Sequence, residues 1–187
     1  MKNIVEKVKN KMIQISEDKF KETGLDNWNI HIKLVYENAH NLALERNADV
    51  EIVDLSAILH DVARVMEYGP IEEHNIYGAE VAEKILNEYN YPKDRIELVK
   101  KCILNHNFNP KESVEEQIVA DADVLAHFDD LSTFYYIAFV MKKLNIDDAK
   151  RFVRDKLEFD YKKLSNYGKE KYKDRYDNII KVLFVSK

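Results

Sequence analysis

The sequence predicts an all-α protein that folds as a single-domain helical bundle. Only 4 glycines and 3 prolines occur among 187 residues, so few positions force a helix to stop. Lysine, glutamate, leucine, isoleucine and alanine are frequent, and these residues favour long helices. Hydrophobic residues make up 45% and charged residues 34%, a balance typical of a folded globular chain. The length suits one domain with a substantial core.

Composition also sets expectations about partners and compartment. A net charge of −5 does not provide the basic face that nucleic acid requires, so we expect no nucleic-acid partner. A single cysteine, Cys102, cannot form an internal disulfide and fits a reducing compartment. The sequence shows no signal peptide and no apolar run as long as a membrane span. We therefore expect a cytoplasmic protein without a membrane partner.

The first two helices are predicted from apolar spacing. Residues 2–22 form an amphipathic helix, which ends at the break 24–27, where Asp26 or Asn27 can cap the next helix. That helix runs to about residue 47 and carries His31 on its inner side. A lone histidine on an apolar stripe is usually a core residue, so His31 alone does not indicate a site.

The third helix ends in the adjacent pair His60 and Asp61. Asp49 can cap this helix, and an apolar run leads from there to the pair. Imidazole and carboxylate side by side suit a divalent metal ion. The alternative is a histidine at a helix end that is hydrogen-bonded by its neighbour.

Two further histidines stand at the ends of apolar stripes. A loop at 66–72, which could form part of a substrate rim, precedes a helix that carries His74 and Gly78 on one face. Gly78 would allow another backbone to approach closely. The helix predicted over 94–107 places His106 on its apolar face.

A carboxylate lies on the inner stripe of the following helix. Ser113 and Glu116 form a capping box at its start, and Asp123 lies one turn after the apolar Val119. A buried carboxylate needs a partner, either a metal ion or a basic side chain. His127, one turn further on, could hydrogen-bond to this site or lie on the helix surface.

Aromatic residues dominate the chain after residue 130. At helical spacing they are more often core than a binding site, so we expect the helices of 131–187 to cover the bundle. Part of this surface could also form a homodimer.

Taken together, five separated segments resemble the HD superfamily of metal-dependent phosphohydrolases, in the family's order. They are His31–Ala43, Ala57–Asp61, His74–Ala79, Ile103–His106 and Asp121–Leu125. The resemblance covers about residues 28–130. It implies a single HD-type domain over residues 1–187, a helical bundle with the metal ion in its middle.

The resemblance also implies roles for individual residues. The four ligands of a primary metal ion would be His31, His60, Asp61 and Asp123. The residues His74 and His106 match histidines that either hold a second ion bridged by Asp61 or face the substrate phosphate. Residues two apart on a helix point in different directions, so Asp121 and Asp123 cannot both be ligands, and the resemblance favours Asp123.

Arg64 follows the metal histidine by one turn. It could bind a phosphate through two hydrogen bonds, or it could pair with Glu67 or Glu72. Family members that resemble 5′-deoxynucleotidases have an acidic residue at this position, so that specificity is not expected here.

The implied activity is hydrolysis of a phosphate ester or anhydride of a nucleotide or other small phosphorylated metabolite by a metal-activated water. Asp61, Arg64, His74 and His106 would be the catalytic residues, and the cofactor would be one or two ions of Mn, Fe, Co, Ni, Zn or Mg. Two alternatives stay open. One is a metal-containing module that binds or senses nucleotides without turnover, and the other is a di-iron oxygenase on the same fold.

Overall fold

The computed structural model describes residues 4–107 and 111–184, and those residues form helices joined by short turns, with no strand among them. This confirms the prediction of an all-α fold. The chain divides into two compact units, Met1–Asp123 and Val124–Lys187. The expectation that residues 131–187 cover a bundle formed by the preceding part stays a prediction.

The first unit contains the helices that position the predicted site residues. In chain order these are α1 (Ile4–Thr23), the π-helix η1 (Trp28–Ile32), α2 (Lys33–Glu45), α3 (Val50–Leu59), α4 (Val62–Met66), the 3-10 helix η2 (Ile71–Glu73), α5 (His74–Glu88), α6 (Lys93–Asn105) and the first part of α7 (Val114–Asp129).

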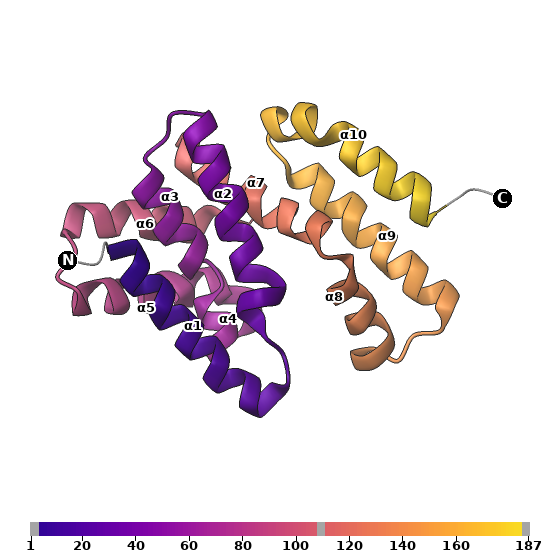
Figure 1. Ribbon diagram of the computed structural model, residues 1–187, viewed down its shortest axis with the longest axis horizontal. Coiled ribbons are helices and arrows are strands. Elements are labelled where there is room, and N and C mark those ends of the chain that lie inside the picture. The colour runs from indigo at the N-terminus through magenta and orange to yellow at the C-terminus, as the bar shows by residue number, and fades with distance from the viewer. Residues whose placement is uncertain (1–3, 108–110, 185–187) are drawn as a thin grey trace. The chain divides into compact units, whose positions relative to one another are not determined.

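Helix α3 is the centre of this unit. Every residue from Ile52 to Leu59 is buried, so α3 is enclosed on all sides rather than on one face. It packs against α1, α2 and α6, while α5 packs against α4 and α6 (Figure 1). The pair His60–Asp61 therefore follows the most deeply buried helix of the unit.

Side-chain caps begin these helices where the sequence predicts them. Asp49 accepts a hydrogen bond from the N–H of Ile52 at 3.2 Å, and Ser113 accepts one from the N–H of Glu116 at 3.2 Å. Before η1 the capping side chain is Asp26, which accepts from the N–H of Asn29 at 3.1 Å. Each cap satisfies an N–H group that has no partner within its helix.

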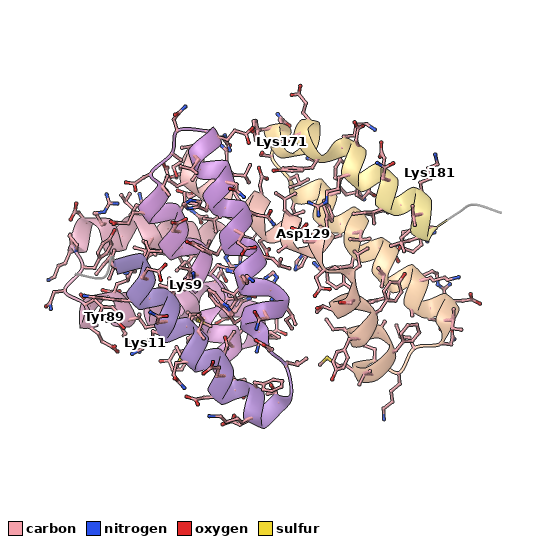
Figure 2. The ribbon with its side chains drawn as sticks, in the orientation of Figure 1. Lys9, Lys11, Tyr89, Asp129, Lys171 and Lys181 are labelled. Atoms are coloured by element: carbon pink, nitrogen blue, oxygen red, sulfur yellow. The ribbon has the colours of Figure 1, made fainter. Side chains whose placement is uncertain are left out.

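The surface of the first unit is charged. Lys11 of α1 pairs with Glu88 at the end of α5 at 2.6 Å, and Lys7 lies 5.7 Å from the ring centroid of Tyr89. Figure 2 shows Lys11 and Tyr89 on the same side of this unit. These contacts join the first helix to α5 from outside the core.

None of the helices described is both long enough and apolar enough to span a bilayer.

The second unit contains the end of α7, α8 (Leu131–Tyr136), the π-helix η3 (Ile137–Met141), α9 (Ile146–Lys163) and α10 (Asn166–Leu183). Asn145 caps α9 and Ser165 caps α10. The rings of Tyr161 and Tyr176 stack with centroids 4.1 Å apart, which joins α9 to α10.

The expectation of an aromatic core in this unit is only partly met. Phe134 is buried, but Tyr136, Phe139 and Phe159 are 42%, 43% and 45% exposed. Consecutive apolar residues point to different sides of a helix, and α9 packs against only part of the surface of α8 and η3. Several aromatic rings therefore remain at the surface.

Candidate metal centre

All four predicted ligands of the primary metal ion meet around one point. His31 lies in η1, His60 ends α3, Asp61 follows it, and Asp123 lies in α7. The Nε2 atom of His31 is 3.2 Å from Nε2 of His60 and 3.3 Å from Oδ1 of Asp123. Oδ2 of Asp61 is 3.7 Å from Nε2 of His31 and 3.8 Å from Nε2 of His60.

These separations fit a shared cation. Nitrogen and oxygen ligands lie about 2.0–2.2 Å from a zinc ion, so two ligands of one ion are about 3–4 Å apart. The exposed fractions are 0% for His60, 5% for Asp61 and 7% for Asp123. Two buried carboxylates that lie within 4 Å of the same histidine require positive charge nearby, which a divalent ion would supply.

A second donor set adjoins the first through Asp61. Its other oxygen, Oδ1, is 3.5 Å from Nε2 of His74, and Nε2 of His74 is 3.3 Å from Nε2 of His106. His74 begins α5, and His106 follows the last residue of α6. Each oxygen of the Asp61 carboxylate thus faces a different set of imidazoles.

The Oδ1 atom of Asp61 is buried and, within the described residues, has no hydrogen-bond partner. Buried carboxylate oxygens normally accept hydrogen bonds, because an unsatisfied one is costly. Ligation of a cation would satisfy this atom. The donor sets and this unsatisfied oxygen therefore fit a divalent metal ion.

Backbone carbonyls orient three of the imidazoles. The Nδ1 atoms of His60, His74 and His106 lie 2.8, 2.8 and 2.6 Å from the carbonyl oxygens of the residues three positions earlier. A carbonyl oxygen can only accept, so each Nδ1 carries the proton and donates it. Each Nε2 lone pair then faces the cluster, which is how ligating histidines are commonly held.

Burial and neighbouring charges together set the charge of two members. Burial and the neighbouring His60 lower the pKa of His106 to about 4, so its imidazole is neutral near pH 7 and can act as a ligand. Burial by itself would raise the pKa of Asp61, but Arg64, His60 and His31 outweigh it and leave that pKa below its usual value. Asp61 is therefore a carboxylate.

A break between two helices brings His60 and Asp61 to the same place. Neighbouring residues in a continuous helix point about 100° apart. Here α3 ends at Leu59, α4 begins at Val62, and Asp61 has φ −107° and ψ 14°, outside the helical region. This local turn allows adjacent residues to reach one cluster.

Arg64 contacts the site itself. Its Nη1 donates to Oδ2 of Asp61 at 2.9 Å, and its side chain remains 47% exposed. The ion pair that we considered, to Glu67 or Glu72, is not the one formed, and Glu67 instead pairs with Lys19 at 2.9 Å. The Arg64 side chain therefore reaches from Asp61, in the candidate metal centre, to the surface of the protein.

The sequence left the roles of Asp121 and His127 open. Asp121 is buried on α7 and belongs to neither donor set. His127 belongs to the second unit, where its Nδ1 lies 2.9 Å from Oδ2 of the fully buried Asp160. His127 is therefore partly buried and hydrogen-bonded to a carboxylate.

Sequence analysis missed two asparagines beside the histidines. Nδ2 of Asn107 is 3.2 Å from Nε2 of His74, and Nδ2 of Asn75 donates to the carbonyl oxygen of Leu104 at 2.8 Å. Each asparagine directly follows a site histidine at a helix end. That adjacency is a signal in the sequence, because asparagine side chains commonly bond to backbone groups there.

A helical unit with two adjoining histidine–carboxylate donor sets defines a protein able to hold a divalent metal ion. Residues 29–127 match the family model of the HD domain. This match covers more than half of the 187 residues, and the chain belongs to the HD domain family.

Two curated relatives match parts of the chain. An uncharacterized protein of Clostridium beijerinckii is 33% identical over 86 residues, which are 46% of this chain and 54% of that protein. The tRNA (cytidine(56)-2′-O)-methyltransferase of Thermoplasma volcanium is 29% identical over 129 residues, 64% of this chain and 37% of that protein. The chain thus matches about half or less of each relative.

Two crystal structures share the fold. A predicted HD superfamily hydrolase from an uncultured Thermotogales bacterium aligns over 80% of this chain and 85% of its own, with a TM-score of 0.56 and 24% identity. An HD-superfamily hydrolase from Bacillus thuringiensis aligns over 97% of this chain and 100% of its own, with a TM-score of 0.66 and 18% identity.

Proposed function

We propose that this protein is a metal-dependent phosphohydrolase that cleaves a phosphate ester or anhydride of a nucleotide or another small phosphorylated metabolite. The observation that supports this most is the position of Asp61, whose two oxygens face two histidine sets. The descriptions of both structural neighbours as HD superfamily hydrolases agree with it.

The ligands of one ion would be His31, His60, Asp61 and Asp123, and His74 with His106 would hold a second ion or face the substrate phosphate. A bound divalent ion lowers the pKa of a bound water and neutralises charge on a phosphoryl group. The protein's own contribution is to keep the imidazoles oriented and the Asp61 carboxylate ionised in a buried site.

Arg64 is the proposed phosphate contact. Its Nη1 already donates to Asp61, and the exposed half of the side chain leaves other N–H groups able to meet a phosphate oxygen. A guanidinium here would orient the phosphoryl group and balance its negative charge.

A small substrate is favoured over RNA. The name of the Thermoplasma relative refers to tRNA methylation, but this chain matches only 37% of that protein. The net charge of −5 supports a small phosphate compound, since RNA binding depends on basic surface.

The test is phosphate release by the full-length protein after chelation and reloading with Mn, Fe, Mg, Co or Ni. The panel contains nucleotides and generic phosphate esters, and the metal content of each sample is measured. We expect release by the wild type, no release by Asp61→Ala, and unchanged release by Asp155→Ala, which removes an exposed carboxylate on α9.

Each other outcome has a definite meaning. Metal binding with no release across the panel would contradict hydrolysis and favour nucleotide sensing or, with two irons and oxygen consumption, an oxygenase. Phosphate release that persists in Asp61→Ala would show that the reaction does not require Asp61. A protein that binds no metal would contradict the whole proposal.

A further inference from the structure

The His74–His106 pair depends on how two neighbouring helices are aligned. His74 is the first residue of α5, and His106 follows the end of α6. The carbonyls of Ile71 and Ile103 fix each imidazole relative to its own segment. Those local contacts do not fix the two segments relative to each other, so the 3.3 Å separation of the Nε2 atoms needs a link between the helices.

Asn75 supplies such a link. Its Nδ2 donates to the carbonyl oxygen of Leu104 across the interface of α5 and α6, at 2.8 Å. Asn75 follows His74 directly, and Leu104 precedes His106 by two residues. The hydrogen bond therefore joins α5 to the backbone of α6, within two residues of each histidine.

The same end of α6 is also held from α7. Nδ2 of Asn105 donates to Oε2 of Glu116 at 2.8 Å, and that oxygen also accepts from the N–H of Glu112 at 3.1 Å. Glu116 is 2% exposed and lies on α7, two turns before Asp123. With α6 held on the α7 side in this way, Asn75 joins α5 to the backbone of α6 near the two histidines.

We propose, on the basis of the proposed function, that Asn75 is a positioning residue that sets the His74–His106 pair for the second of the two metal ions. Its hydrogen bond is to the backbone of α6, so we infer that it acts on that ion through the two imidazoles. Loss of a group that hydrogen-bonds directly to a metal ligand typically weakens metal binding about 10- to 100-fold, and for a link one step further from the ligands we expect the lower end of that range.

The test is calorimetric titration of the full-length, chelator-treated protein with Mn²⁺. The wild type is expected to bind two ions, and His74→Ala identifies which binding event belongs to the second set. Asn75→Ala should weaken that event about tenfold or more and change the other by less than about threefold. Asn75→Leu, which keeps a similar size without a donor or a charge, should behave in the same way.

Asn87→Ala is the matched control, because Asn87 is an exposed asparagine on the same helix. It should leave both binding events unchanged. A second event that is unaffected by Asn75→Ala, equal weakening of both events, or a wild type that binds one ion would overturn the proposal. A wild type that binds no ion would contradict the proposed function itself, and this proposal with it.

Discussion

At the residue scale, Asp61 joins the two donor sets, as the resemblance to the HD superfamily implies. The order of histidines and carboxylates on apolar stripes predicts which side chains gather, because each stripe faces the core. The partner of Arg64 could not be chosen in this way. Glu67 pairs with Lys19, far away in sequence, whereas Arg64 pairs with Asp61 through the local turn at α4.

Arg64→Ala tests the phosphate contact. We expect the KM for a phosphate substrate to rise about 10- to 100-fold, because a hydrogen bond to a charged group contributes about 1.5–3 kcal/mol. Metal affinity should not fall, since Arg64 is not in either donor set. Steady-state kinetics and metal titration check this. An unchanged KM would show that Arg64 only pairs with Asp61.

At the element scale, helix positions and caps were predictable, but the hydrogen-bond pattern within a helix was not. The π-helix at 28–32, which carries His31, has the same polar and apolar residues that an α-helix would have. The wider turn of a π-helix is a difference in backbone hydrogen bonding, which the apolar spacing does not record. Close helix packing at Gly78, in contrast, was predicted and is confirmed.

Gly78→Val tests that packing. A Cβ atom at Gly78 would lie 3.3 Å from the carbonyl oxygen of His60 and 3.3 Å from Cγ2 of Ile103. We expect the free energy of unfolding to fall by about 1–3 kcal/mol and metal affinity to fall with it, because the His60 backbone must shift. Glu80→Val, at an exposed position of the same helix, is the control in chemical denaturation. Equal effects of the two changes would contradict the account.

Asp160→Asn tests the buried cluster in the second unit. Burial would raise the pKa of Asp160, but His127 and Lys156 outweigh it and lower that pKa, and Lys163 lies 3.6 Å away. A lowered folded-state pKa means stability that is present above about pH 4 and lost as pH falls further. We expect a loss of about 3 kcal/mol at pH 7 and a smaller difference at pH 3.

The measurement is urea unfolding followed by circular dichroism at both pH values. Asp155→Asn serves as control, because Asp155 lies on the same helix with a side chain that is 68% exposed. The same loss at pH 7 and pH 3 would show that the ionised form of Asp160 does not provide the stability.

At the scale of the whole molecule, length and composition predict one domain, which stays a prediction, and they do not indicate the division into two compact units. The boundary falls between Asp123 and Val124, inside the continuous helix α7. No glycine, proline or polar linker marks it, because a helix runs across it. Only the tertiary contacts distinguish the units, and these are not visible as a composition change.

Metal binding should stabilise the first unit in particular. Trp28 is the single tryptophan, and it is 7% exposed in η1 beside the segment that carries His31. At a free metal concentration of 100 times Kd, the gain is about 2.7 kcal/mol. We expect the midpoint of thermal unfolding, followed by Trp28 fluorescence, to rise when metal is added. It should return to the metal-free value when a chelator is added. No shift would contradict binding within this unit.

The most direct test of the central claim is an anomalous difference map from a crystal grown with Mn²⁺. We predict a peak within about 2.0–2.6 Å of the ligand atoms of His31, His60, Asp61 and Asp123, and a second near Oδ1 of Asp61, His74 and His106. Manganese bound only at other side chains, with no peak beside Asp61, would contradict the account.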